Sequence, residues 1–246
     1  MIQSIARSLE ALEILAENPE QPKFLSEIAG RMGLKLGTCA NILRTLTDLH
    51  YADQPAARKG YTLGMMAYFI TRNGPFRRDL IGAAEAGMRK LAEQVRETVL
   101  LAVLSNGRRI ILSQISGDDI YQVREQFLMR EDIYRTATGR LLLAHAPKHE
   151  MQSVLTRKGL PDKDQWPEAD SQKKLAAALE KIRQDGRVMT SDSVAGISYP
   201  LYEKGKVVAA LGLFLPKHKL TRAHKAKILS CMAVAAKVIS ARISGS

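Results

Sequence analysis

The pattern of apolar positions near the N-terminus predicts two short helices joined by a tight turn. Apolar side chains recur every three or four residues in residues 25–31 and again in residues 38–49, as on one face of an amphipathic helix. Met32-Gly33-Leu34 between them is the glycine-containing turn of a helix-turn-helix. The predicted apolar face consists of Leu25, Ile28, Ala29, Cys39, Ile42, Leu43, Leu46 and Leu49.

The other face of the second helix carries small, polar or basic side chains, which suit the base edges of a DNA major groove. Two short extended runs follow at residues 50–53 and 60–63, with a basic tip between them, in the arrangement of a β-wing. An ordinary helical hairpin with a loop is the alternative, but the polar face and the basic wing together favour DNA binding. The predicted DNA contacts are Lys35, Gly37, Thr38, Ala40, Asn41, Arg44, Arg58 and Lys59.

Breaks in the pattern divide the chain into domains. A helix with Ser4 as its N-cap precedes the helix-turn-helix, and a later helix over residues 65–72 stops at Asn73-Gly74-Pro75, the strongest break in the chain. The first helix is predicted to pack through Ile5, Leu9, Leu12 and Ala16. The predicted domains are a winged helix-turn-helix over residues 1–72, a linker helix over residues 73–96 and a second domain over residues 97–246.

Alternating strands and helices predict an α+β second domain built on one antiparallel sheet with flanking helices. Ser105-Asn106-Gly107 separates two apolar β-rich runs and indicates a hairpin. Predicted strands cover residues 98–104, 108–115, 121–124, 188–189, 196–202 and 206–214, and predicted helices cover residues 138–145, 150–157, 173–184 and 220–243. The last helix is predicted to bury Ile228, Met232, Ala235, Val238 and Ile239.

Three separated motifs make the chain resemble the IclR family of bacterial transcription regulators over nearly all of its length. The recognition helix with the "GYTLG" end of the wing, the "TATGRLLLAHAP" segment of residues 136–147 and the "ISYPLYEKGKVVAALGLFLP" segment of residues 197–216 occur in the family's order and spacing. The resemblance implies a winged helix-turn-helix followed by a GAF-like effector-binding domain. It also implies binding of operator DNA and of a small organic acid.

Composition describes a globular chain with an uneven charge distribution. The 246 residues are 46% apolar and 25% charged, and no apolar run approaches the ~18 residues of a membrane span. The formal net charge is +12, yet residues 1–75 hold eight Lys and Arg against seven Asp and Glu. From Lys204 to Ser246 nine Lys and Arg occur without an acid, a run that faces either phosphates or solvent. Two cysteines in distant segments and the absence of a secretory signal favour a cytoplasmic protein without disulfides.

The sequence contains little that points to catalysis. It has no P-loop, no GxGxxG after a strand, no HExxH and no CxxC, so we expect neither an enzyme nor a cofactor. His145 and His149 are four residues apart, as metal ligands on one helix would be. Pro147 between them indicates that a helix ends there, and we therefore expect no metal site.

The expected ligand site lies at the start of a helix. Backbone N–H groups of Ala137, Thr138 and Gly139, together with the positive helix end, suit a carboxylate, and Arg135 or Arg140 is expected to add charge. A plain N-cap is the alternative on these residues alone. The family resemblance favours the ligand, because family effectors are held by the backbone of this loop.

Other contacts carry over from the resemblance unevenly. The family's acidic position falls on Asp192, with Thr190 beside it, whereas its cysteine position falls near Gly196 and two serine positions fall on Gly212 and Phe214. A pocket that loses polar groups in this way favours an aromatic or larger hydrophobic acid. Ser198 completes the predicted effector contacts, and the side chains expected nearby are Tyr199, Phe127 and Tyr134.

We therefore predict a transcriptional repressor that binds a palindromic or repeated operator as a dimer or dimer of dimers. The organic acid in the second domain is expected to change the placement of the DNA-binding heads. One alternative is a small-molecule sensor or enzyme whose N-terminal domain only mediates oligomerisation. Another is a non-specific nucleic-acid-binding protein that uses the basic C-terminal run. The effector, the operator and the regulated genes cannot be derived from the sequence.

Overall fold

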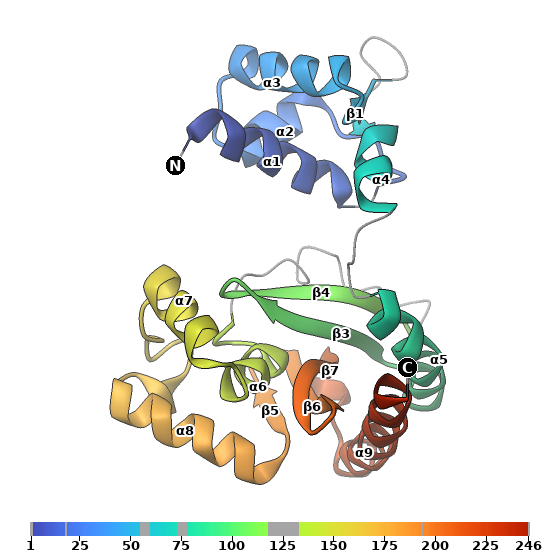
Figure 1. The fold of residues 1–246 in the computed structure, drawn as a ribbon, viewed down its shortest axis with the longest axis vertical. Helices are drawn as coiled ribbons and strands as arrows, with labels where there is room; N and C mark the ends of the chain where they lie inside the picture. Colours follow the sequence, from blue (N-terminus) through green and yellow to red (C-terminus); the bar gives the residue numbers. More distant parts are fainter. Residues whose placement is uncertain are drawn as a thin grey trace. The chain divides into compact units, whose positions relative to one another are not determined.

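The computed structural model describes residues 2–17, 19–54, 60–72, 78–117, 133–192 and 194–245. The chain divides into two compact units, Met1–Phe76 and Arg77–Ser246. The elements of the first unit are α1 (Gln3–Ala16), α2 (Leu25–Arg31), α3 (Leu36–Asp48), β1 (Ala52–Asp53), β2 (Thr62–Leu63) and α4 (Met65–Arg72). Figure 1 shows helices α1, α2 and α3 packed together beside the short strands.

The first unit is the predicted winged helix-turn-helix. Helices α2 and α3 surround a small core in which Ile28, Cys39 and Leu43 are fully buried. Strands β1 and β2 pair antiparallel, and an isolated bridge between Lys23 and Tyr61 extends the wing. The predicted basic tip, Arg58 and Lys59, lies outside the described residues.

Helix α1 packs through a face that shares only Leu12 with the predicted one. Its buried side chains are Ala11, Ile14 and Leu15, whereas Ile5 and Leu9 are each 55% exposed. Ser4 is not the N-cap, because the helix already begins at Gln3 and Ile2 caps it without a side-chain hydrogen bond. The helix carries two apolar stripes of the same period, so periodicity alone could not select the one that meets α3.

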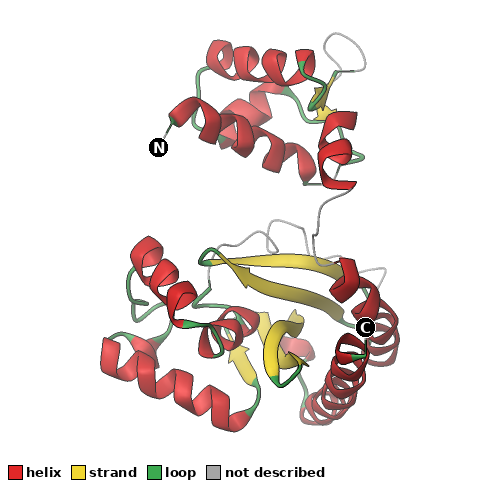
Figure 2. Cartoon of the chain, in the orientation of Figure 1, coloured by secondary structure: helices red, strands yellow, loops and turns green. Residues whose placement is uncertain are grey.

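The second unit contains an antiparallel sheet with helices on both faces, so the predicted α+β class is confirmed (Figure 2). The strand order is β4-β3-β7-β6-β5, and each neighbouring pair is antiparallel. The strands are β3 (Thr98–Ser105), β4 (Arg108–Ile115), β5 (Val188–Ser191), β6 (Val194–Glu203) and β7 (Lys206–Pro216). The helices are α5 (Arg78–Val95), α6 (Ala137–Ala144), α7 (Lys148–Lys158), α8 (Gln172–Asp185) and α9 (Arg222–Ser244), with short 3-10 turns η2 (Pro167–Ala169) and η3 (Lys217–Lys219).

The predicted hairpin joins β3 and β4 through a turn of the type that Asn-Gly favours. Asn106 and Gly107 have φ angles of 50° and 73°, which is the pair of left-handed residues of a type I′ turn. The Glu150 carboxylate of α7 accepts the N–H groups of both, at 2.9 and 2.7 Å. The possible strand over residues 121–124 lies outside the described residues.

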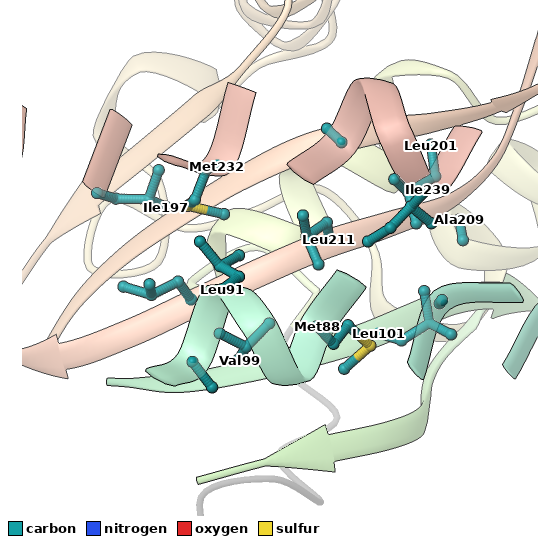
Figure 3. Packing of buried hydrophobic residues seen from close by; sticks show 14 of the residues in the cluster. Met88, Leu91, Val99, Leu101, Ile197, Leu201, Ala209, Leu211, Met232 and Ile239 are labelled. Carbon is teal, nitrogen blue, oxygen red and sulfur yellow. The ribbon is translucent and has the colours of Figure 1, made fainter. Parts of the chain in front are cut away.

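Two cores lie on opposite faces of the sheet. Helices α5 and α9 run side by side over one face, where Met88, Leu101 and Ile239 interlock (Figures 1 and 3). Most of the predicted inner face of α9 is buried, but Val238 is 45% exposed, and Ala236 and Ile243 are buried in addition. In the part of the chain that the structure describes, every helix is too short or too polar to span a bilayer.

The other face of the sheet lies under α6 and α8. Leu100, Ala102, Val188 and Ala210 of the strands pack against Leu141 and its neighbours in α6. The buried Trp166 and Tyr134 close this second core at the loop side. The second core is therefore the part of the unit that supports the start of α6.

Candidate functional site

Helix α3 presents the predicted DNA contacts on its outer surface. Lys35, Gly37, Thr38, Asn41 and Arg44 are all exposed, and only Ala40 is half-buried. The Arg44 guanidinium donates a hydrogen bond to Asn41 Oδ1 at 2.9 Å. The two side chains that can read base edges are thus linked, one helical turn apart.

The placement of α3 depends on its turn and on the supporting helix. Gly33 has φ of 62°, a left-handed conformation that a residue with a Cβ adopts only under strain. Arg31 at the end of α2 forms a two-pronged ion pair with Glu17 beyond α1, at 2.7 and 2.8 Å. Phe24 occupies the N-cap position of α2, and its apolar side chain forms no capping hydrogen bond.

The backbone N–H groups at the start of α6 belong to buried residues. Thr136 is the N-cap, and its Oγ1 accepts the N–H of Gly139 at 3.1 Å. This part of the structure therefore contains the plain N-cap that the sequence allowed as an alternative. The preceding N–H groups, of Ala137 and Thr138, have no partner among the described residues, and Ala137 and Thr138 are 5% and 4% exposed.

Two glycines of the sheet lie close to the first residues of α6. A Cβ at Gly196 would lie 3.7 Å from the Ala137 nitrogen and 2.7 Å from Thr190 Oγ1. A Cβ at Gly212 would overlap the Thr138 methyl group. The predicted effector positions Thr190, Gly196 and Phe214 form one row across β5, β6 and β7, and Ser198 pairs with Gly212 in the next row.

The other predicted effector residues differ in how far they are buried. Ser198 is fully buried, and its hydroxyl donates to the Leu211 carbonyl at 3.2 Å. Phe214 is half-buried on the α6 face of the sheet. Asp192 is exposed, in the turn between β5 and β6.

Three side chains that were expected near the ligand form hydrogen bonds or ring contacts with other parts of the protein. Tyr199 lies on the α9 face of the sheet, where its hydroxyl donates to the Leu229 carbonyl at 3.3 Å. The buried Tyr134 donates to the Gly159 carbonyl at 2.5 Å. Arg140 stacks over the Trp166 ring, 4.5 Å from its centre, and donates to loop carbonyls.

Arg135 is exposed, and Phe127 lies outside the described residues. A cation that sequence reasoning missed is Arg109 of β4, which donates to Thr138 Oγ1 at 3.3 Å. Arg109 pairs with Leu104, so counting back from the Asn106-Gly107 turn would have placed it on the α6 face. Its contact with Thr138 depends on the long side chain and could not be read from the pattern.

The two histidines that suggested a metal site lie on opposite sides of a break. Helix α6 ends at Ala144, and α7 begins at Lys148, beyond Pro147. Burial, and then the nearby Arg183 guanidinium, lower the pKa of His145. Across the residues with described positions, no three His, Cys, Asp or Glu side chains gather as metal ligands would.

A winged helix-turn-helix joined to a separate antiparallel-sheet unit defines the class of two-domain transcriptional regulators. Residues 76–241 match the family described as "Bacterial transcriptional regulator IclR C-terminal". The chain therefore belongs to the IclR family of bacterial transcriptional regulators, which are not enzymes. The family expected from the motifs is confirmed.

Individual relatives match along most of the chain. The HTH-type transcriptional regulator KdgR of Escherichia coli is 24% identical over 250 residues, covering 98% of this chain and 93% of that protein. The glycerol operon regulatory protein of Streptomyces coelicolor is 30% identical over 228 residues, with coverage of 90% and 87%. An IclR homologue of Microbacterium hydrocarbonoxydans, solved with 4-hydroxybenzoate, shares the fold with a TM-score of 0.71 and 22% identity, covering 99% of this chain and all of that one.

Proposed function

We propose that the protein is a repressor that reads operator DNA with α3 and senses a small aromatic or hydrophobic carboxylic acid under the start of α6. The observation that carries the sensing part is the buried start of α6, where the Ala137 nitrogen lies close to Gly196 of β6 and the Thr138 side chain lies over Gly212 of β7. In this arrangement the Met1–Phe76 unit binds DNA and the Arg77–Ser246 unit binds the effector.

A carboxylate suits this place for two reasons. The N-terminal end of a helix carries a partial positive charge, and its first N–H groups are donors without intrahelical partners. Gly196 lets β6 approach the start of α6 closely, because a Cβ there would lie 2.7 Å from Thr190 Oγ1 and 3.3 Å from the Ala137 Cβ. The Arg109 guanidinium, bonded to Thr138, adds positive charge at the same helix end.

The surroundings of the donors favour an apolar body on the acid. Leu100 and Phe214 lie on the same sheet face as Gly212 and Gly196, whereas the hydroxyl of Ser198 is already bonded to a carbonyl. A ring can pack on such apolar surface without leaving polar groups unpaired. The homologue that binds 4-hydroxybenzoate supports this size and chemistry for the ligand.

The surface of α3 supports sequence-specific reading. An Asn amide can form two hydrogen bonds with adenine, and Arg can form two with guanine. A single head of this size contacts too few bases to select one genomic site, so we infer a dimer or dimer of dimers. The acid can regulate only by binding the DNA-competent and incompetent arrangements with different affinities.

The test is a titration of the full-length protein against the DNA upstream of its own gene, with an unrelated duplex beside it over a range of salt. We expect a preference of at least ~1000-fold for one fragment, which weakens when an aromatic acid is added. Gly196→Val should keep the DNA preference and lose the response to the acid. Equal affinity for both duplexes, with and without acids, would instead favour a sensor whose first unit serves only oligomerisation.

A further inference from the structure

A polar side chain lies on the sheet face beneath α6, two strands from the glycine that contacts Thr138. Gln114 of β4 pairs with Leu100 of β3, and Leu100 pairs with Gly212 of β7. Residues directly opposite one another on antiparallel strands project from the same face, so Gln114 shares the face of Leu100. Leu100 belongs to the core under α6, whereas Ile115, next to Gln114, packs on the α5 and α9 side.

The oxygen of the Gln114 amide has no hydrogen-bond donor among the described residues. This atom, Oε1, is also buried. A buried acceptor without a donor carries a desolvation cost, which native structures rarely leave uncompensated. A ligand bound on this face would remove the cost if it carried an O–H or N–H group at the right place.

The spacing indicates where that donor must be on the ligand. Neighbouring strands lie about 4.8 Å apart, so the backbones of Gln114 and Gly212 are separated by roughly 10 Å. The glutamine side chain spans part of this distance, and Leu100 covers the sheet between the two residues with 5% exposure. A carboxylate at the α6 N–H groups and a donor at Gln114 would therefore be separated by about the length of one six-membered ring.

We propose that Gln114 is a specificity-determining residue that selects aromatic acids bearing a hydroxyl or amino donor across the ring from the carboxylate. The proposal rests on the effector site proposed above. Without an acceptor a hydroxyl is penalised in an apolar site, because it must give up its hydrogen bonds to water. A difference in affinity between acids with and without the hydroxyl therefore depends on Gln114, because both acids carry the same carboxylate.

The experiment compares 4-hydroxybenzoate with 4-methylbenzoate, which has a similar size and no donor, by calorimetric titration of the full-length protein. We expect the wild type to bind the hydroxy acid about tenfold more tightly. Gln114→Leu should lose this preference while it keeps its affinity for 4-methylbenzoate, a result that also shows that the variant folds. Gln172→Leu, at an exposed position of α8, is the matched control and should bind both acids as the wild type does.

The outcomes separate the two proposals. Equal or weaker binding of the hydroxy acid by the wild type would overturn the role of Gln114 and leave the effector site standing. A preference that persists in Gln114→Leu would overturn it as well. If neither acid bound the wild type, the aromatic effector site would fall, and the role of Gln114 would fall with it.

Discussion

Replacing Gly139 by alanine should destabilise the second unit, although alanine is the better helix former. A Cβ at this position would overlap the Ile133 carbonyl oxygen and lie 2.6 Å from Thr136 Oγ1, the atom that caps α6. The first contact is with backbone, which cannot rotate away as the end of a flexible side chain can. The substitution therefore tests whether the close turn at the start of α6 is required.

The expected magnitude follows from three contributions. Alanine gains up to about 1 kcal/mol over glycine in a helix. Displacing the Thr136 hydroxyl loses a cap worth about 1 kcal/mol, and overpacking costs a further ~1–3 kcal/mol. Gly139→Ala should thus lower the free energy of unfolding by roughly 1–3 kcal/mol.

The matched control is Gly82→Ala in α5, where a Cβ would meet nothing within 4 Å. There only the helix preference remains, so this variant should gain about 0.5–1 kcal/mol. Urea unfolding followed by fluorescence is suitable because the chain has one tryptophan, the buried Trp166 beside Arg140 of α6. Equal stabilities of the two variants would refute the argument that the turn at Ile133 and Thr136 excludes a side chain.

Three further outcomes follow from the described contacts. Asn41→Ala and Arg44→Ala should each weaken operator binding by ~1–3 kcal/mol in fluorescence anisotropy, with unchanged urea unfolding because both side chains are exposed. Since burial and Arg183 lower the pKa of His145, the unfolded chain binds that proton more tightly. Stability should therefore be full above pH ~6.5 and decrease as the pH falls below it, and His145→Asn should reduce this slope in urea titrations at pH 7.5 and 5.5. Tyr134→Phe should cost about 1 kcal/mol in thermal unfolding, because its buried hydroxyl donates to a carbonyl at 2.5 Å; no loss would mean that this bond contributes nothing net.

Much of the fold could be predicted from local pattern. The helix over residues 25–31 has the predicted bounds, and the Asn106-Gly107 turn has the left-handed angles that its residues favour. Period-two alternation of side chains also separates two of the residues predicted near the ligand. Ser198 and Tyr199 are adjacent on β6 and must project from opposite faces, so they could not both line one pocket.

The contacts of two arginines at the candidate site could not be predicted from the sequence. Arg140 follows Gly139 directly, yet its guanidinium turns to Trp166 and to loop carbonyls. Arg109 meets Thr138 from a strand 29 residues earlier in the chain. Contacts of long side chains depend on which partners the fold brings within a few ångströms, and nothing in the neighbouring sequence encodes that.

The amino-acid sequence alone predicts the helix-turn-helix and the strands of the sheet, because periodicity and turn chemistry act over a few residues. The family followed from the resemblance of three motifs. Only the tertiary structure decided which apolar stripe of α1 is buried, and only it brought Gln114, Leu100 and Gly212 into one row. Both apolar stripes of α1 satisfy the same local rule, and the row joins strands that lie about a hundred residues apart in the chain. Packing against distant partners makes that choice, since it alone determines which surfaces leave water.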